Sequence, residues 1–183
     1  GDGGLAVNAF LKQPAGIAFD VSGNLFIADQ YNKRIRKVDA STGIITTVAG
    51  DGSVTNYGGD GGQATAAHLS YPVAIAIDQN GNLLISDYNN SRIRKVDAST
   101  GIITTIAGIG NYTFGGDGGL AVNASINFPA GIQCDAVGDI YFSDQDNFRI
   151  RKIDASTGII TTVAGNGTQG FSGDGATATS AML

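Results

Sequence analysis

The feature that most constrains the fold is a segment of fourteen residues that occurs three times. Residues 34–47 read RIRKVDASTGIITT, residues 92–105 are identical, and residues 149–162 differ only by Ile153 in the place of Val38. The surrounding residues keep the same period, because the prolines at 14, 72 and 129 are spaced 58 and then 57 residues apart. Self-similarity at a fixed period indicates one supersecondary unit that is repeated along the chain.

Each repeat contains four short segments rich in apolar and β-branched residues, separated by turns rich in Asp, Asn and Gly. Such segments are typical of β-strands, and turns this short join antiparallel neighbours. In the first repeat the expected strands are 16–20, 24–29, 34–38 and 44–49. A sheet with two apolar faces must stack on copies of itself, so we expect an all-β propeller with three four-stranded blades. A helical solenoid fits antiparallel strands less well.

The whole chain, 1–183, is expected to form one domain. The predicted blades are about 14–50, 72–108 and 129–165, and glycine-rich connections occupy 1–13, 51–71, 109–128 and 166–183. Every connection contains Gly-Asp-Gly, and we expect its Asp to cap a short helical turn. These residues are Asp2, Asp60, Asp117 and Asp174. An aromatic residue three positions earlier is expected to anchor the connection: Tyr57, Phe114 and Phe171.

Composition excludes some functions. The net charge is −5 with a sequence pI near 4.5, which disfavours nucleic acid as a partner because that affinity depends on neutralising phosphates. No apolar run is long enough to span a membrane. A single cysteine, Cys134, permits no internal disulfide, and His68 is the only histidine. We expect a packed thiol and a surface histidine, with no catalytic group, metal site or cofactor.

An acidic residue ends the second strand of every repeat, and an arginine follows five residues later. The pairs are Asp29 with Arg34, Asp87 with Arg92, and Asp144 with Arg149. A ring of carboxylates could bind cations or sugars. We prefer a structural interpretation, in which each Asp binds the turn and pairs with its arginine, because a binding group is seldom needed identically in every repeat.

The turn between the second and third strands differs among the repeats, as does the connection that follows each blade (51–57, 109–114 and 166–171). Loops on a rigid scaffold commonly carry binding functions. The candidate ligand-binding residues are therefore Tyr31, Lys33, Tyr88, Asn89, Asp146 and Phe148. We expect the aromatic side chains among them to be exposed. Drift at unconstrained surface positions is the alternative.

The motif PAGIAFDxxGNLFIADxxNxRI at 14–35 resembles the NHL repeat, and it recurs at 72–93 and 129–150. The long period and the Gly-Asp-Gly-Gly-x-Ala connection resemble bacterial NHL proteins and teneurins. Two departures occur in the third repeat, where Asp139 replaces an Asn and Gln133 with Cys134 interrupts the apolar inner strand. The resemblance implies a propeller that usually has six blades, so this chain would supply half of a ring.

We therefore expect a non-enzymatic binding or scaffolding module that holds a protein, glycan or small molecule on its loops. The alternatives are a lyase with a metal in the channel, as in some NHL-fold enzymes, and an RNA-binding module. Localisation stays open, with an extracellular or cell-surface place in a bacterium preferred.

Self-association is the expected partnership, as a homodimer that closes a six-bladed ring. Segments 1–11 and 173–183 are copies of one connection. We expect them to compete for one place at each junction between the two chains.

Overall fold

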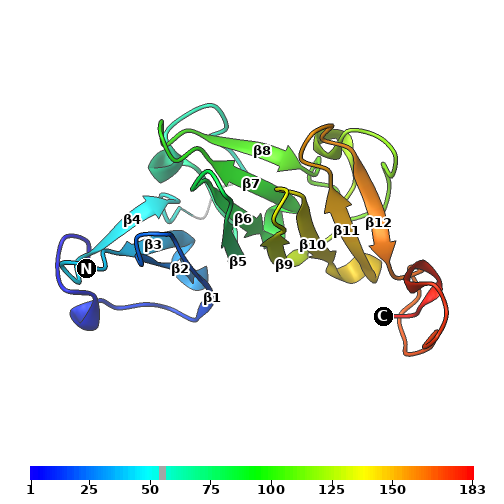
Figure 1. Cartoon of the computed structure of the whole chain (residues 1–183). Helices are drawn as coiled ribbons and strands as arrows, with labels where there is room; N and C mark the ends of the chain where they lie inside the picture. The colour runs from blue at the N-terminus through cyan, green and yellow to red at the C-terminus, as the bar shows by residue number, and fades with distance from the viewer. Residues whose placement is uncertain (54–56) are drawn as a thin grey trace.

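The computed structural model describes residues 1–53 and 57–183, and it shows three four-stranded antiparallel sheets with strands in chain order (Figure 1). The first blade comprises β1 (Pro14–Phe19), β2 (Leu25–Asp29), β3 (Arg34–Val38) and β4 (Ile45–Ala49). The second comprises β5 (Pro72–Ile77), β6 (Leu83–Asp87), β7 (Arg92–Val96) and β8 (Ile103–Ala107). The third comprises β9 (Pro129–Cys134), β10 (Ile140–Asp144), β11 (Arg149–Ile153) and β12 (Ile160–Ala164). The chain therefore has the three four-stranded blades of the all-β propeller that the sequence predicts.

Helical structure among the described residues is limited to single 3-10 turns. One turn follows the second strand of each blade: η2 (Gln30–Asn32), η4 (Tyr88–Asn90) and η6 (Gln145–Asn147). The others lie in the connections: η1 (Ala6–Asn8), η3 (Ala64–Ala66), η5 (Ala121–Asn123) and η7 (Ala178–Ser180). In the part of the chain that the structure describes, no helix is long and apolar enough to cross a membrane.

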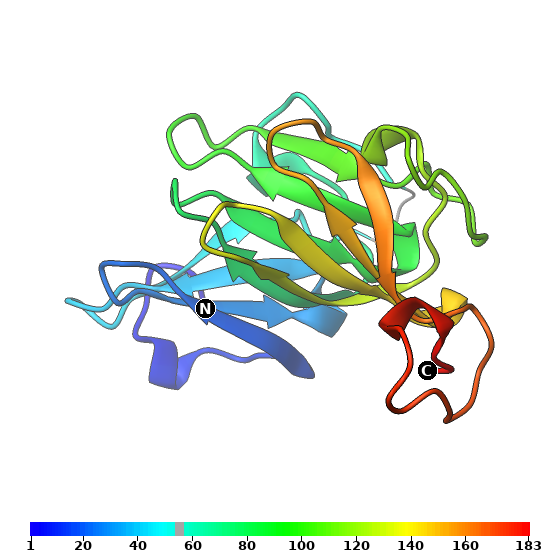
Figure 2. The same ribbon diagram turned by 45° about the vertical axis from the view of Figure 1, so that its right-hand side comes forward.

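The blades stack side by side in an arc, with β1, β5 and β9 as neighbouring inner strands and β4, β8 and β12 on the outside (Figures 1 and 2). An apolar cluster fills each of the two junctions between blades. Phe26, Ile35 and Ile85 belong to the first cluster, and Leu84 and Phe142 belong to the second. Packing between sheets thus buries the apolar faces that a single blade would expose.

The invariant Asp-Ala-Ser-Thr-Gly sequence forms the turn between the third and fourth strands. In the first blade, Oδ1 of Asp39 accepts hydrogen bonds from the N–H and hydroxyl groups of Ser41 and Thr42, at 2.7–3.1 Å. Gly43 then adopts φ +68°, which favours glycine. The same bonds surround Asp97 and Asp154. Turn geometry therefore accounts for the identity of these residues.

The turn between the first two strands has Asx geometry, since Oδ1 of Asp20 accepts the N–H groups of Ser22 and Asn24. Asn24 also accepts a hydrogen bond from the N–H of Ala40, which ties two turns of one blade together. In the third blade Asp139 does the same for the N–H of Ala155, and its second oxygen accepts a hydrogen bond from Lys152 Nζ at 2.7 Å. The Asn-to-Asp departure thus keeps the bond and adds an ion pair.

Each of the first three connections lies against the outer edge of the blade that follows it. Gln63 forms a bridge with Ile102, beside the outer strand β8, and Leu5 forms the equivalent bridge with Ile44, beside β4. The prediction that the Gly-Asp-Gly carboxylates cap helices is wrong, because η3 begins at Ala64 after a residue that makes no capping hydrogen bond. The connection pairs with the outer edge of the blade first, and the 3-10 turn begins only after this pairing. Asp60 consequently lies beside Thr105 and Arg94.

Each strand-ending aspartate is fully buried, and the predicted choice of arginine partner is wrong. Asp87 contacts Arg94 at 3.2 Å, and the equivalent pairs are Asp29 with Arg36 and Asp144 with Arg151. Arg34, Arg92 and Arg149 instead donate to backbone carbonyls of the turn and the connection. In the sheet register Arg92 lies directly opposite Asp87. The sequence spacing identified this neighbour correctly, but its side chain turns away toward the connection.

The pH dependence of stability should reflect the Asp39-type turns. Their hydrogen bonds, the hydroxyl of Ser41 or Ser99 first, lower the pKa of Asp39 and Asp97 to about 2. Because the folded pKa lies below the unfolded value of about 3.9, this stabilisation is present above that pH and is lost as the pH falls toward 2. A variant with Asp39→Asn, Asp97→Asn and Asp154→Asn should therefore be less stable than the parent at pH 5, and this difference should shrink by pH 2.5. Urea unfolding at both pH values measures it, and a difference that stays constant would contradict the interpretation.

Loss of a buried aspartate should be costly. Asp87→Ala leaves the guanidinium of Arg94 buried with one carboxylate fewer, and breaking a buried pair in this way typically destabilises a protein by about 3 kcal/mol or more. Asp146→Ala, in the exposed turn of the third blade, is the control and should change stability by less than about 0.5 kcal/mol. Denaturant unfolding of both variants makes the comparison. Equal effects would show that the buried pair adds nothing.

Candidate functional site

The turns after the second strands share one side of the molecule with the beginnings of the connections, and we call this side the loop face. Arg92 donates to the carbonyl of Ile109 at 2.8 Å, and Tyr112 donates its hydroxyl to the carbonyl of Asn89 at 3.0 Å. The side chain of Asn147 in turn binds the carbonyl of Thr113 at 3.1 Å. The connection from the second blade thus bridges the turns of the second and third blades.

Aromatic rings meet on the loop face at both junctions between blades. Tyr31 lies edge-on to Tyr71, with ring centroids 4.9 Å apart. At the next junction Tyr88 stacks on Phe128 at 4.8 Å, and Tyr112 lies 5.3 Å from the same Phe128 ring. In each case an aromatic residue that precedes the proline of one blade covers the turn of the blade before it.

The predicted contact residues differ in how far they are exposed to solvent. Tyr31 is 39% exposed and Asp146 is exposed, whereas Tyr88 and Phe148 are only half-exposed. The expectation that all the aromatic candidates are exposed is therefore wrong for Phe148 and for Tyr88, whose ring is covered by Phe128. Lys33 is also half-buried.

Asn89 is half-buried too, and it contributes backbone contacts: its N–H donates to Ser70 and its carbonyl accepts from Tyr112.

Sequence reasoning missed Tyr112, which is 56% exposed. It also missed Tyr71 and Phe128, which stand before the blade prolines in the left-handed region with φ +52° and +49°. Comparing the residue before the proline in the three repeats, which is Gln13, Tyr71 or Phe128, would have shown that this position varies. Residues 54–56 of the variable segment 51–57 lie outside the described residues.

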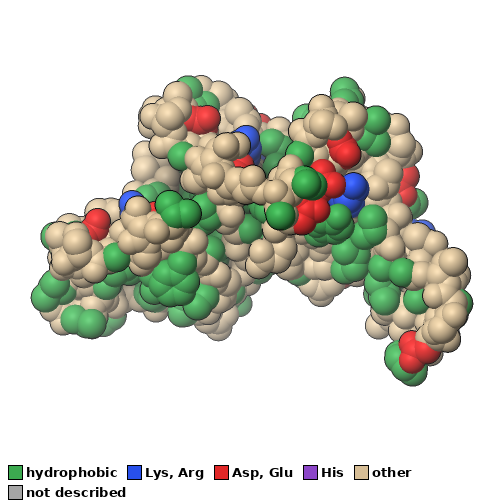
Figure 3. Space-filling view, in the orientation of Figure 1, with side chains coloured by type: hydrophobic (Ala, Val, Ile, Leu, Met, Phe, Trp, Pro, Cys, Tyr) green, Lys and Arg blue, Asp and Glu red, His purple; other side chains and the backbone are tan. Residues whose placement is uncertain are grey.

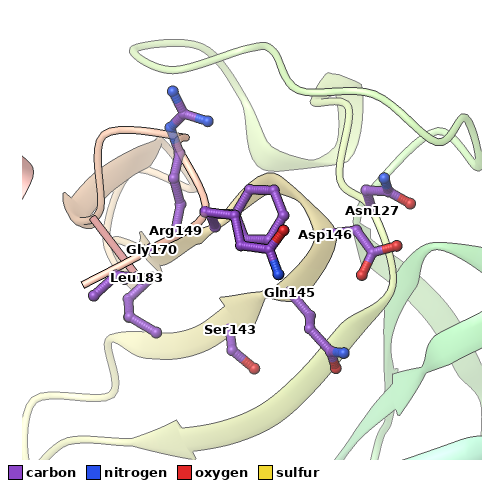
Figure 4. Close-up of a pocket in the computed structure, with 10 residues that line it drawn as sticks. Asn127, Ser143, Gln145, Asp146, Arg149, Gly170 and Leu183 are labelled. Carbon is purple, nitrogen blue, oxygen red and sulfur yellow. The ribbon is translucent and has the colours of Figure 1, made fainter. Parts of the chain in front are cut away.

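A pocket opens on the loop side of the third blade, at the end of the arc (Figure 4). Its lining includes Gln145 and Asp146 of the turn, Asn127 before β9, Ser143 of β10 and Leu183 of the C-terminal segment. At the two junctions inside the chain, the corresponding place is filled by Tyr71 or Phe128.

The inner strands line a second, mostly apolar groove. Gly16, Ala74 and Gly131 contribute to it, and its polar lining residues are Gln133, Tyr141 and Ser143. Among the described residues no group of three or more His, Cys, Asp and Glu side chains could hold a metal ion. The carboxylates of the Asp–Arg pairs are buried and engaged, so they are not presented to a ligand.

The lone histidine lies beside the turn of the second blade, where its carbonyl accepts a hydrogen bond from Asn90 at 3.4 Å, and the lone cysteine is the last residue of β9. His68 is half-exposed in its connection, with Nδ1 2.6 Å from Ser53 Oγ and 3.3 Å from Asp51 Oδ2. Cys134 packs against the cluster between the second and third blades, and burial, with smaller effects of Asp78 and Asp135, raises the pKa of its thiol to about 11. A thiol with such a pKa is a poor nucleophile at neutral pH.

Comparison with known proteins agrees with this geometry. The family model for the teneurin NHL domain matches residues 1–58, 53–115 and 110–182, once for each repeat. Chicken teneurin-1 is 32% identical over 177 residues, which cover 89% of this chain and 6% of the teneurin. The chloroplastic protein SUPPRESSOR OF QUENCHING 1 of Arabidopsis thaliana is 36% identical over 98 residues, which cover 54% of this chain and 9% of that protein. The chain thus spans a small part of each relative.

Solved structures share the fold at low sequence identity. A Bacteroides thetaiotaomicron protein of unknown function superimposes with a TM-score of 0.73 at 21% identity, over 94% of this chain and 40% of that one. A streptogramin B lyase gives 0.59 at 17% identity, over 85% and 41%. A Xanthomonas campestris gluconolactonase gives 0.60 at 15% identity, over 90% and 52%. With a family match in every repeat and three stacked four-stranded blades, the chain belongs to the teneurin NHL domain family.

Proposed function

We propose that the chain is a non-enzymatic binding module whose loop face takes a protein partner. The observation that carries this proposal is the contrast between backbone and side chains on that face. The last residue before the first strand and the residue after the 3-10 turn have positive φ in all three blades, between +48° and +55°. Their side chains nevertheless differ, as Gln13, Tyr71 and Phe128 at the first position and Lys33, Ser91 and Phe148 at the second.

A left-handed backbone costs about 1 kcal/mol or more for residues other than glycine, so the scaffold over-determines these positions. A rigid backbone that presents different side chains is the usual basis of recognition by loops. Tyr112 fits such a role, because its hydroxyl is held by Asn89 and its ring by Phe128, although 56% of its surface is exposed. Tyrosines fixed in this manner contribute strongly to protein interfaces at a low entropic cost.

The enzyme alternative has less support. The lyase and the gluconolactonase share the fold at identities under 20%, which carries no catalytic residue to this chain. The apolar inner groove offers Gln133, Tyr141 and Ser143, with no carboxylate or imidazole among its lining residues. The net charge of −5 likewise argues against an RNA-binding role.

Two substitutions on the loop face test the proposal. Arrays of purified secreted and cell-surface proteins, and a glycan array in parallel, would be probed with the labelled chain. Tyr112→Ala and Tyr31→Ala are each expected to weaken binding to a protein hit about tenfold or more, because truncating an interface tyrosine removes a central contact. Surface plasmon resonance measures the loss.

Thr104→Ala is the matched control, since Thr104 is exposed on the outer strand β8, away from the loop face, and its loss should leave affinity unchanged. Unchanged affinity in both tyrosine variants would refute the loop-face site. Binding to glycans alone would refute a protein as the partner.

A further inference from the structure

We propose that a second copy of this chain docks head-to-tail on both ends of the arc and closes a ring, and that Gly173–Leu183 of each copy takes the place of Gly1–Leu11 on the other. The contact between the third blade of one copy and the first blade of the other is called the seam. This inference does not depend on the proposed binding function, because it concerns the blade faces and the connections.

The free face of the first blade is built for a blade-to-blade junction. Ile17 and Phe19 on β1 are 60% and 61% exposed. Their counterparts one repeat later are Ile75, which is 4% exposed in the cluster between the first two blades, and Ile77, which is partly buried against that cluster. Figure 3 shows hydrophobic side chains gathered over this part of the first blade. Equal positions in equal repeats are therefore buried in the interior and open at the end.

The free face of the third blade shows the complementary feature, open space at a position that lies close to the next blade inside the chain. A Cβ on Gly16 would lie 2.8 Å from the Cα of Ala74, so the close approach of the second blade requires glycine there. Gly131 occupies the same position in the third blade, yet the nearest atom to a Cβ built there is a side-chain oxygen of Ser143 at 3.6 Å. The second blade has Ala74 at this position and still packs against the third blade, so the position takes a small residue, and an incoming first blade would fill the space beside Gly131.

Each internal junction also has a contact between an arginine and an aromatic ring. At the two ends of the arc, each partner of such a contact is present without the other. Inside the chain, the guanidinium of Arg92 lies 3.6 Å from the centroid of the Tyr57 ring, and that of Arg149 lies 3.7 Å from Phe114. The next aromatic in this series is Phe171, which is 87% exposed, and the next arginine is Arg34 of a following first blade. Head-to-tail docking brings these two together.

The terminal connections each make half of the hydrogen bonds of an internal one. Ala64 donates its N–H to Gly101 of the following blade and accepts with its carbonyl from Gly50 of the preceding blade. Ala6 makes only the first of these bonds, to Gly43, and Ala178 makes only the second, from Gly165. A C-terminal segment docked on the partner's outer strand would make both bonds and also place Phe171. Gly1–Leu11 can make only one, so it should be the segment that is displaced.

The same docking completes the pocket of the third blade. Tyr71 and Phe128 fill this place inside the chain, and the residue in their position at the seam is Gln13 of the second copy. The pocket already presents Gln145 and Asp146, which are polar partners for an amide. The pocket at the end of the arc is thus the open half of a junction.

Mass in solution is the first test. Sedimentation equilibrium of the 183-residue chain should give twice the chain mass of 18.6 kDa. Phe19→Asp should yield a folded monomer, since this side chain is already exposed in the single chain. Thr104→Asp is the matched control: Thr104 is exposed on the outer strand of the second blade, away from both ends of the arc, and its loss should leave the dimer intact. A parent protein that remains monomeric at all concentrations would overturn the proposal.

Gly131→Leu distinguishes head-to-tail docking from a symmetric contact between two first blades. There is room for this side chain in the single chain, so the variant should fold and be monomeric. A mixture of the Phe19→Asp and Gly131→Leu variants should form a dimer again, because one of its two seams is then unaltered. A Gly131→Leu variant that stays dimeric, or a mixture that stays monomeric, would contradict the head-to-tail arrangement.

A disulfide trap tests the exchange of segments in a Cys134→Ser background. Thr177 occupies the position of Leu5 and Gln63, which bridge to Ile44 and Ile102. Residues bridged in this manner are close enough for a disulfide. Thr177→Cys with Ile44→Cys should therefore give a covalent dimer on a non-reducing gel, while Leu5→Cys with Ile44→Cys should not cross-link efficiently. Efficient intrachain closure of the Leu5 pair without a covalent dimer from the Thr177 pair would refute the exchange.

Discussion

The carboxylate at the end of the second strand holds each blade together, because three other segments of the chain bond to it. Asp87 accepts the N–H of Ser70 from the connection, the amide of Asn90 from the turn and the guanidinium of Arg94 from the third strand. Arg94 extends the network to Asp60 of the connection. Burial raises the pKa of Asp87, opposed by its hydrogen bonds and by Arg94, so the site is stable only with all partners in place. The turn and the connection that form the loop face are thereby fixed to the strands.

This network explains why some positions repeat and others vary. Residues whose side chains satisfy the backbone or a buried charge are the same in all blades, such as Asp39 in its turn and the Asp–Arg pairs. The residues that follow these repeated side chains can differ among the blades, because the conformation of the backbone there does not depend on their side chains. Tyr31, Asn89 and Asp146 occupy one such equivalent position. Candidate recognition residues are therefore found beside the most constrained residues of the fold.

Much of the architecture follows from the sequence alone. The repeat, the turn residues and the apolar strands predict four-stranded blades, and β3 (Arg34–Val38) lies at the expected residues. Contacts that depend on side-chain direction could not be obtained in this way. The arginine opposite Asp29 in the sheet is Arg34, but the buried pair forms with Arg36 because Arg34 turns to the carbonyl of Asp51.

The loop face could be predicted only in part for a similar reason. The variable turns identified Tyr31, but exposure depends on which ring covers which. Phe128, far from Tyr88 in sequence, stacks on it and leaves Tyr112 as the more open ring. Spacing within one repeat contains no information about contacts that cross from one repeat to the next.

Ala64 is hydrogen-bonded to two blades at once, and this has a consequence for how the protein unfolds. One residue donates to the blade ahead and accepts from the blade behind, so neither blade can leave without breaking a bond held by the other. The cooperative unit is then the junction rather than the blade, and stability grows with the number of junctions, as in a one-dimensional chain of coupled units. In the single chain, opening should start at the two end blades, where a connection is bonded on one side only. The second blade, which is bonded on both sides, should exchange its amide protons last.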